Sequence, residues 1–108
     1  MNAKSVIFLL LAACISACAT IKLTEPTQVD AERGSQKFPG YSMNDLAEGK
    51  KIYEANCNKC HRYKVPESRD EAKWDDIIPK MAKKAKLSSD QQELVLKYVV
   101  TMSTAKSK

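Results

Sequence analysis

Histidine is almost absent from this chain of 108 residues, because His61 is the only one, and cysteine occurs four times. A closed structural zinc site needs four ligands, usually two pairs of cysteine or histidine. Cys14 and Cys18 lie in an apolar N-terminal segment, so only Cys57, Cys60 and His61 stand together. A zinc site would therefore have to recruit carboxylates, which is uncommon in closed structural sites.

The sequence also lacks an apolar run long enough to predict a transmembrane helix. The unbroken run Val6–Ala13 falls short of the roughly 20 apolar residues that a spanning helix needs. It follows Lys4 and has the proportions of the core of a secretory signal peptide. We therefore expect the protein to be exported. The segment could be a lipoprotein signal, as the next residues indicate, an ordinary secretory signal or an uncleaved anchor.

Two stretches at the end of this segment resemble the bacterial lipobox, in which an aliphatic residue and two small residues precede a cysteine that becomes lipidated. They are residues 11–14 and 15–18, which end at Cys14 and Cys18. Cys18 is favoured because cleavage before it leaves a fuller apolar core on the departing peptide. The prediction is a lipoprotein signal peptide over residues 1–17 and a lipid on Cys18 that holds the chain at the periplasmic side of a bacterial membrane.

The feature that decides the chemistry is Cys57-Asn58-Lys59-Cys60-His61, because Cys-x-x-Cys-His is the attachment signature for c-type haem. Two thiols three positions apart on a helical turn can reach the two vinyl groups of one porphyrin. The adjacent histidine is then held under the iron as its axial ligand. A redox dithiol would sit beside a strand of a βαβ unit, but no β-branched strand run flanks the motif. A plain disulfide would close a very short loop and contribute little.

Large apolar aromatic residues are scarce, with two Phe and one Trp beside four Tyr. Residues 42–108, the predicted folded domain, lie in the size range in which a polypeptide core rarely suffices without a metal, a disulfide or a similar staple. A buried porphyrin would supply the missing apolar surface, so we expect the chain without haem to fold poorly. The net charge of +5 is modest and suits docking to proteins rather than to nucleic acid.

Residues 19–41 mix prolines, glycines and charges of both signs without a sustained period. They predict a flexible tether between the lipidated cysteine and the domain, with a coil span of about 25 Å. The alternative for its end, Phe38–Tyr41, is docking on the domain.

Three helices are expected, and no strand is convincing. The first covers residues 44–56, where Ser42 and Asp45 resemble a capping box. Its central glycine, Gly49, is explained by a close crossing with another helix. The last helix covers residues 89–104 and is capped by Ser88 and Ser89 with Gln91 and Gln92. It carries one apolar stripe, formed by Leu94, Val95, Tyr98, Val99 and Met102.

The middle segment, Arg69–Lys86, places an apolar series at helical spacing. Pro79 removes one backbone donor and crowds the preceding turn. A kink, or a helix that ends near Ile78 with a new turn from Pro79, is therefore expected. The apolar series is Trp74, Ile77, Ile78 and Met81.

Together, Gly49-x-x-Ile52-Tyr53, the Cys-x-x-Cys-His motif, the Trp–Met segment and the final amphipathic helix resemble the class I monohaem c-type cytochromes over about residues 44–104. The resemblance implies an all-α fold of three to four helices around one covalent haem c. It implies that Cys57 and Cys60 form the thioethers, that His61 is the proximal ligand and that a downstream methionine is the distal ligand.

Met81 is the predicted distal ligand, because it lies beside the expected helix break and shares a face with Trp74. Met43 precedes the haem motif, and Met102 is more simply explained as core. Met81 could instead be a gap-filling core residue. Trp74 is expected to pack on the porphyrin with its indole N–H on a haem propionate.

The predicted function is one-electron transfer without enzymatic activity, since Asp75 and Asp76 point to different sides of a helix and form no acid–base pair. Membrane attachment through the lipid and redox partners with acidic docking surfaces are expected. The alternatives are a five-coordinate haem that binds ligands as a sensor, and a structural haem subunit of a respiratory complex. The lysines that would guide docking are Lys80, Lys83, Lys84 and Lys86.

Overall fold

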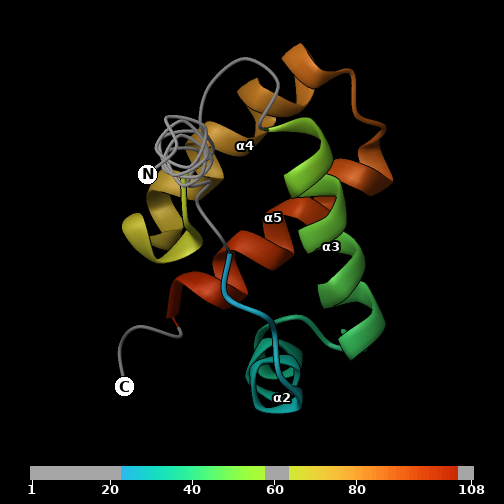
Figure 1. Ribbon diagram of the computed structural model, residues 1–108, viewed down its shortest axis with the longest axis vertical. Coiled ribbons are helices and arrows are strands. Elements are labelled where there is room, and N and C mark those ends of the chain that lie inside the picture. The colour runs from blue at the N-terminus through green and yellow to red at the C-terminus, as the bar shows by residue number, and fades with distance from the viewer. Residues whose placement is uncertain (1–22, 58–63, 105–108) are drawn as a thin grey trace, which may run out of the picture.

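The computed structural model describes residues 23–57 and 64–104, and these ranges contain four α-helices, one 3₁₀ turn and no strand (Figure 1). The all-α class is thus confirmed for the described part of the chain. The elements are α2 (Gln28–Lys37), α3 (Met43–Asn56), η2 (Pro66–Ser68), α4 (Glu71–Ala85) and α5 (Ser89–Ser103).

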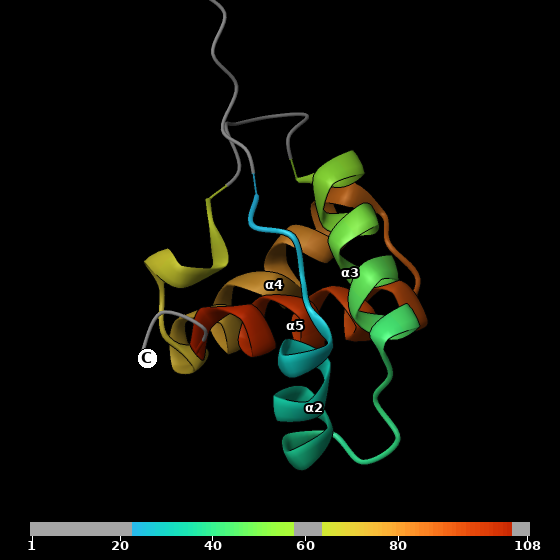
Figure 2. The same ribbon diagram turned by 60° about the horizontal axis from the view of Figure 1, so that its bottom comes forward.

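Helix α5 runs through the middle of the molecule and contacts every other described element: α2, α3, α4 and η2 (Figures 1 and 2). Its predicted apolar stripe lies in the core, where Tyr98 and Val99 are completely buried. Val100 and Thr101, on another side of the helix, are buried too. Because neighbours cover α5 on several sides, tertiary packing offsets the weak helix propensity of its β-branched residues.

The predicted crossing at Gly49 is confirmed. A Cβ atom added to Gly49 would lie 2.7 Å from the Cβ of Tyr98 and would also collide with the backbone carbonyl oxygen of Leu94. Only a residue without a side chain lets α3 and α5 approach this closely.

Capping boxes begin α3 and α5 as predicted. The hydroxyl of Ser42 accepts from the amide of Asp45 at 3.1 Å, and the Asp45 carboxylate accepts from the Ser42 amide at 3.0 Å. Ser88 and Gln91 form the same pair at the start of α5. These local signals place both helix starts within a residue of the predicted positions.

The predicted flexible tether over residues 19–41 is wrong for its described part. Residues 28–37 form α2, which packs on α5, and Leu23, Ala31 and Tyr41 are buried in the core. A third capping box, between Thr27 and Asp30, starts this helix. The alternative for the end of the segment is confirmed, since Phe38 packs against the core and Tyr41 is part of it.

Of the two alternatives expected at Pro79, a helix end near Ile78 is wrong, because α4 continues through Pro79 to Ala85. Trp74, Ile78 and Ala82 are buried along one side of α4, and this packing stabilises the helix on both sides of Pro79. The helix ends instead at Lys86, whose backbone is left-handed with φ 59°. Within the described residues, no helix has the length and apolar character needed to cross a membrane.

Candidate haem-binding site

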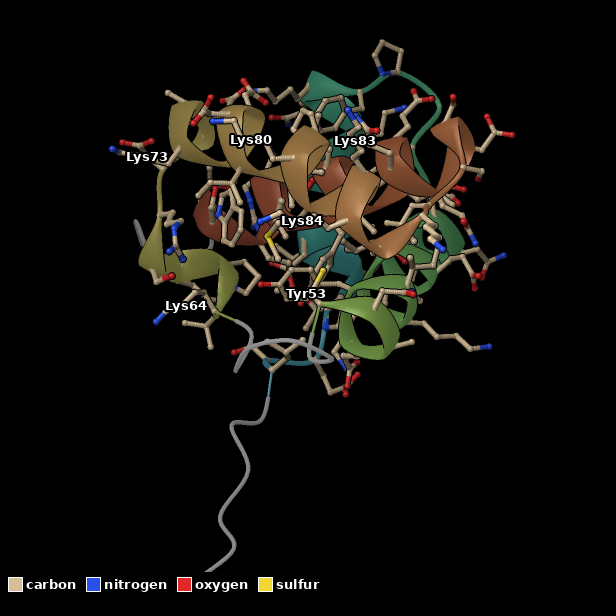
Figure 3. The ribbon with its side chains drawn as sticks, turned by 90° about the horizontal axis from the view of Figure 1, so that it is seen from above. Tyr53, Lys64, Lys73, Lys80, Lys83 and Lys84 are labelled. Carbon is tan, nitrogen blue, oxygen red and sulfur yellow. The ribbon has the colours of Figure 1, made fainter. Side chains whose placement is uncertain are left out.

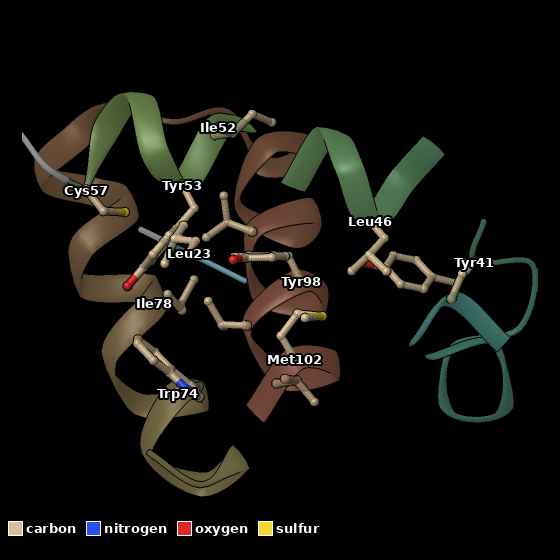
Figure 4. Close-up of a cluster of buried hydrophobic side chains, with 14 residues drawn as sticks. Leu23, Tyr41, Leu46, Ile52, Tyr53, Cys57, Trp74, Ile78, Tyr98 and Met102 are labelled. Carbon is tan, nitrogen blue, oxygen red and sulfur yellow. The ribbon is translucent and has the colours of Figure 1, made fainter. Parts of the chain in front are cut away.

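Cys57, the first cysteine of the haem motif, forms the C-cap of α3, and its amide donates to the carbonyl of Tyr53 at 2.9 Å. The residue is 9% exposed and belongs to the hydrophobic core (Figure 4). It forms no disulfide. Cys60 and His61 lie outside the described residues, as do both candidate lipidation positions, Cys14 and Cys18.

Burial in this apolar setting raises the pKa of the Cys57 thiol to about 11. The thiol is therefore protonated at neutral pH. Redox-active Cys-x-x-Cys pairs rely instead on a lowered pKa, which supplies the reactive thiolate. The environment of Cys57 thus disfavours the dithiol alternative and suits a cysteine that faces an apolar partner.

Tyr53 organises the surroundings of Cys57. Its ring packs edge-on against Trp74, with ring centroids 6.2 Å apart, and lies 5.7 Å from the ring of Tyr98. Its hydroxyl donates to the backbone carbonyl of Lys64. Tyr53 therefore ties the end of α3 to Lys64, the first described residue after the Cys-x-x-Cys-His motif.

Trp74 is buried next to Tyr53, but its polar atom is not available to a propionate. The indole Nε1 donates to the backbone carbonyl of Pro66 at 2.9 Å. The guanidinium of Arg69 lies 5.3 Å from the centre of the indole ring. The expected hydrogen bond from Trp74 to a haem propionate is therefore replaced by one that fixes η2 against α4.

Met81 lies on α4 and is half-buried, and it packs against the core that contains Cys57, Trp74 and Ile78. Met102 is 1% exposed, as expected of a core residue. Met43 is also half-buried, but at the start of α3, the end opposite Cys57. Met81 is thus the methionine on the helix that also carries Trp74 and Ile78, two core neighbours of the haem motif.

The residues present fit an apolar group attached at Cys57. The thiol is buried among apolar and aromatic side chains, and a thioether approaches the same core from α4. The Tyr98 hydroxyl is buried and has no hydrogen-bond partner in residues 23–57 and 64–104. Figure 4 shows this hydroxyl turned toward Tyr53. A buried hydroxyl without a described partner therefore faces Tyr53.

Lysines cover the exposed side of α4 around Met81 (Figure 3). Lys83, Lys84 and Lys86 are exposed, and Lys80 pairs with Asp76 at 3.1 Å. An exposed pair of this kind contributes little to stability. The surface of α4 near Met81 is therefore basic.

Two surface hollows lie elsewhere. The larger, of about 440 Å³, is lined by residues of the entering segment and α3, including Glu25, Lys50 and Glu54. The smaller, of about 300 Å³, lies between Pro39–Tyr41 and α5. Neither includes Cys57 or Met81. Among the described residues, no cluster of three or more histidine, cysteine or acidic side chains could hold a metal ion.

Comparisons with protein-family models, with curated proteins and with solved structures found no match for this chain.

Sequence reasoning missed two contributions to this region. Leu23 was assigned to a tether, yet it lies in the same core as Tyr53 and Cys57 (Figure 4). The Thr27-x-x-Asp30 capping box was the signal that could have revealed a helix there. The bond from Tyr53 to the Lys64 carbonyl has no sequence signal, because a backbone acceptor is available at nearly every position.

Proposed function

We propose that this chain is a membrane-tethered one-electron carrier of the small c-type cytochrome kind, exported to the periplasm. Cys57 and Cys60 would hold one covalent haem, and His61 and Met81 would bind its iron. When bound, this group supplies a one-electron ferric/ferrous couple. The observation that carries the proposal is the Cys-x-x-Cys-His motif of the sequence, whose first cysteine, Cys57, caps α3 and is buried in an apolar, aromatic core.

The chain's own residues have three tasks in this proposal. Tyr53, Trp74 and Ile78 exclude water from the side of Cys57. Met81, if it held the iron, would raise the reduction potential, so a moderately positive value is expected. The lysines of α4 surround Met81 and would attract an acidic partner to that side of the domain.

The test is an optical spectrum of the exported, haem-matured protein, recorded before and after carbon monoxide is added to the reduced form. Ligation by His61 and Met81 predicts a weak near-infrared methionine-to-iron band and no shift with carbon monoxide. Met81→Ala removes the band and opens the iron to carbon monoxide. Met43→Ala is the matched control, because Met43 is also half-buried against the core yet lies at the opposite end of α3.

Two results would contradict the proposal in different ways. A high-spin ferric spectrum with ready carbon monoxide binding in the parent would replace the carrier with the five-coordinate ligand binder or sensor. A protein that carries no haem after maturation, while Cys57 and Cys60 remain free thiols, would remove the cofactor altogether. Recovery in mild detergent of a stoichiometric complex with a respiratory enzyme would favour the structural haem subunit.

A further inference from the structure

The segment that enters the domain from the N-terminal side is part of the folded core. Leu23 is 3% exposed, Ala31 is 2% exposed and Tyr41 is 7% exposed. The folded domain therefore begins at or before Leu23, not at Ser42, and the chain between Leu23 and Tyr41 is not free to act as a spacer.

Polar contacts hold this segment at both of its ends. Arg33 of α2 donates from Nε to the Thr104 hydroxyl at 2.9 Å and from Nη2 to the Thr101 carbonyl at 3.0 Å. Its Nη2 also pairs with Asp30 at 2.8 Å. The two bonds to Thr101 and Thr104 cross from α2 to the C-terminal end of α5, and α2 also packs on α5.

The extended part before α2 is held to α3. The Lys50 ammonium lies 2.9 Å from a carboxylate oxygen of Glu25 and 2.8 Å from one of Glu54. The Lys50 side chain is only 12% exposed. Although partial burial acts in the opposite direction, the bonds to Glu54 and Glu25 raise the pKa of Lys50, so its ammonium keeps its charge at neutral pH.

Only four residues, 19–22, separate Cys18 from Leu23. Even a fully extended chain spans at most about 18 Å between these two positions. A compact domain of about 80 residues has a radius of gyration near 12 Å and hence a diameter of about 30 Å. Because the covalent link is shorter than the domain, the face on which Leu23 enters must lie next to whatever holds Cys18.

That face is at the Cys57 end of α3. Leu23, Tyr53 and Cys57 share one core cluster, and Figure 2 shows the first described residues entering beside the C-terminal end of α3. In Figure 3, Lys80 and Lys83 lie on the side away from the entering chain and from Lys64. The entry face and the side chains of Lys80 and Lys83 therefore face different directions.

We propose that the lipid on Cys18 seats this domain directly on the bilayer in one orientation, with the Leu23 entry face toward the membrane and the α4 lysines Lys80 and Lys83 toward the aqueous phase. An acidic partner protein then docks from the aqueous side, on a surface that the bilayer does not cover. This inference rests on the proposed lipidation of Cys18, but it does not depend on haem.

Neutron reflectometry measures the position of the domain without relying on the haem. The full mature lipoprotein is bound to a supported bilayer of phosphatidylcholine, a zwitterionic lipid that adds no net charge attraction. A direct seat predicts a protein layer one domain thick, with at most about 18 Å of water between it and the headgroups. The orientation of Lys80 and Lys83 is checked by adding an acidic protein, which should bind to the solvent side of the anchored layer.

The test variant inserts twelve Gly/Ser residues between Lys22 and Leu23, a position that leaves every described contact intact. The hydrated gap should widen and the layer should become more diffuse. The matched control places the same twelve residues after Lys108, where the gap should stay as in the parent.

Two outcomes overturn the inference: a parent gap well above 18 Å, or a parent layer that the insertion leaves unchanged. The premise is read separately. If Cys18→Ser still binds the bilayer, or if mass spectrometry finds the lipid on Cys14, the domain is not attached through Cys18. The limit of about 18 Å then no longer applies. A loss of haem spectra with an unchanged layer would contradict the carrier function alone.

Discussion

Replacing Gly49 by alanine should destabilise the domain, although alanine is the better helix former. A Cβ at this position would lie 2.7 Å from Tyr98 Cβ, where ordinary contacts begin at 3.4 Å. The neighbouring obstacle is the backbone carbonyl of Leu94, which can retreat only if α5 moves. The crossing of α3 and α5 must therefore open, and it carries the packing of Tyr53 on Tyr98.

The magnitude follows from two opposing contributions. Overpacking a well-packed contact costs about 1–3 kcal/mol. The higher helix propensity of alanine returns about 1 kcal/mol. Because a backbone group blocks the added atom, we place the cost at or above the upper end of its range and expect a net loss of about 2 kcal/mol in the free energy of unfolding. For a domain of this size, the midpoint of thermal unfolding should fall by roughly 10 °C.

The assay is urea and thermal unfolding of the mature protein, followed by circular dichroism. Ala47→Gly is the control, because Ala47 lies on the exposed side of the same helix and reports the propensity contribution alone. That variant should lose about 1 kcal/mol. If Gly49→Ala instead raises the stability by about as much as Ala47→Gly lowers it, the close crossing does not constrain this position and the reasoning fails.

Three further outcomes are expected. Arg33→Ala should weaken the docking of α2 by about 1–3 kcal/mol, because it removes charged bonds to α5. Hydrogen exchange of the backbone amides over residues 28–37 should therefore become faster. Unchanged exchange would show that apolar packing alone holds α2. Burial alone would raise the pKa of Asp30, but bonds from Thr27 and Arg33 hold it below its ordinary value of 3.8. The resulting stability is complete above pH 3.8 and disappears as the pH falls through the lower folded value, so α2 amides should exchange faster in acid, and Asp30→Asn should flatten this pH dependence. Pro79→Ala should stabilise the domain by about 1–3 kcal/mol, because α4 is already helical at this position and regains a backbone donor. Thermal unfolding measures this change. A lower melting temperature would mean that the proline fits a bend the domain needs.

Local signals predicted much of the fold. The Ser42–Asp45 and Ser88–Gln91 capping boxes fixed the starts of α3 and α5, since the side chains that satisfy the first amides of a helix lie within three residues of it. Gly49 correctly indicated a close crossing, because a glycine inside an amphipathic helix is unfavourable unless another backbone approaches it.

Where prediction failed, distant contacts outweighed local preference. Pro79 opposes a helix locally, but burial of Trp74, Ile78 and Ala82 on one side of α4 keeps the helix continuous. The indole of Trp74 donates to Pro66 rather than to a propionate, an acceptor that becomes available only once η2 packs on α4. The segment around α2 has little apolar content, and its helix gains its stability from α5.

The sequence by itself determined the Cys-x-x-Cys-His motif, the all-helical class, the helix starts and the place of Gly49, because each depends on residue types at short, fixed spacing. Tertiary structure alone decided that Leu23 belongs to the core, that Tyr53 holds Lys64 and that α2 docks through Arg33. These contacts join residues far apart in the chain or use backbone carbonyls as acceptors. Neither leaves a pattern in the order of the residues, since both arise only when separate elements bury a common surface.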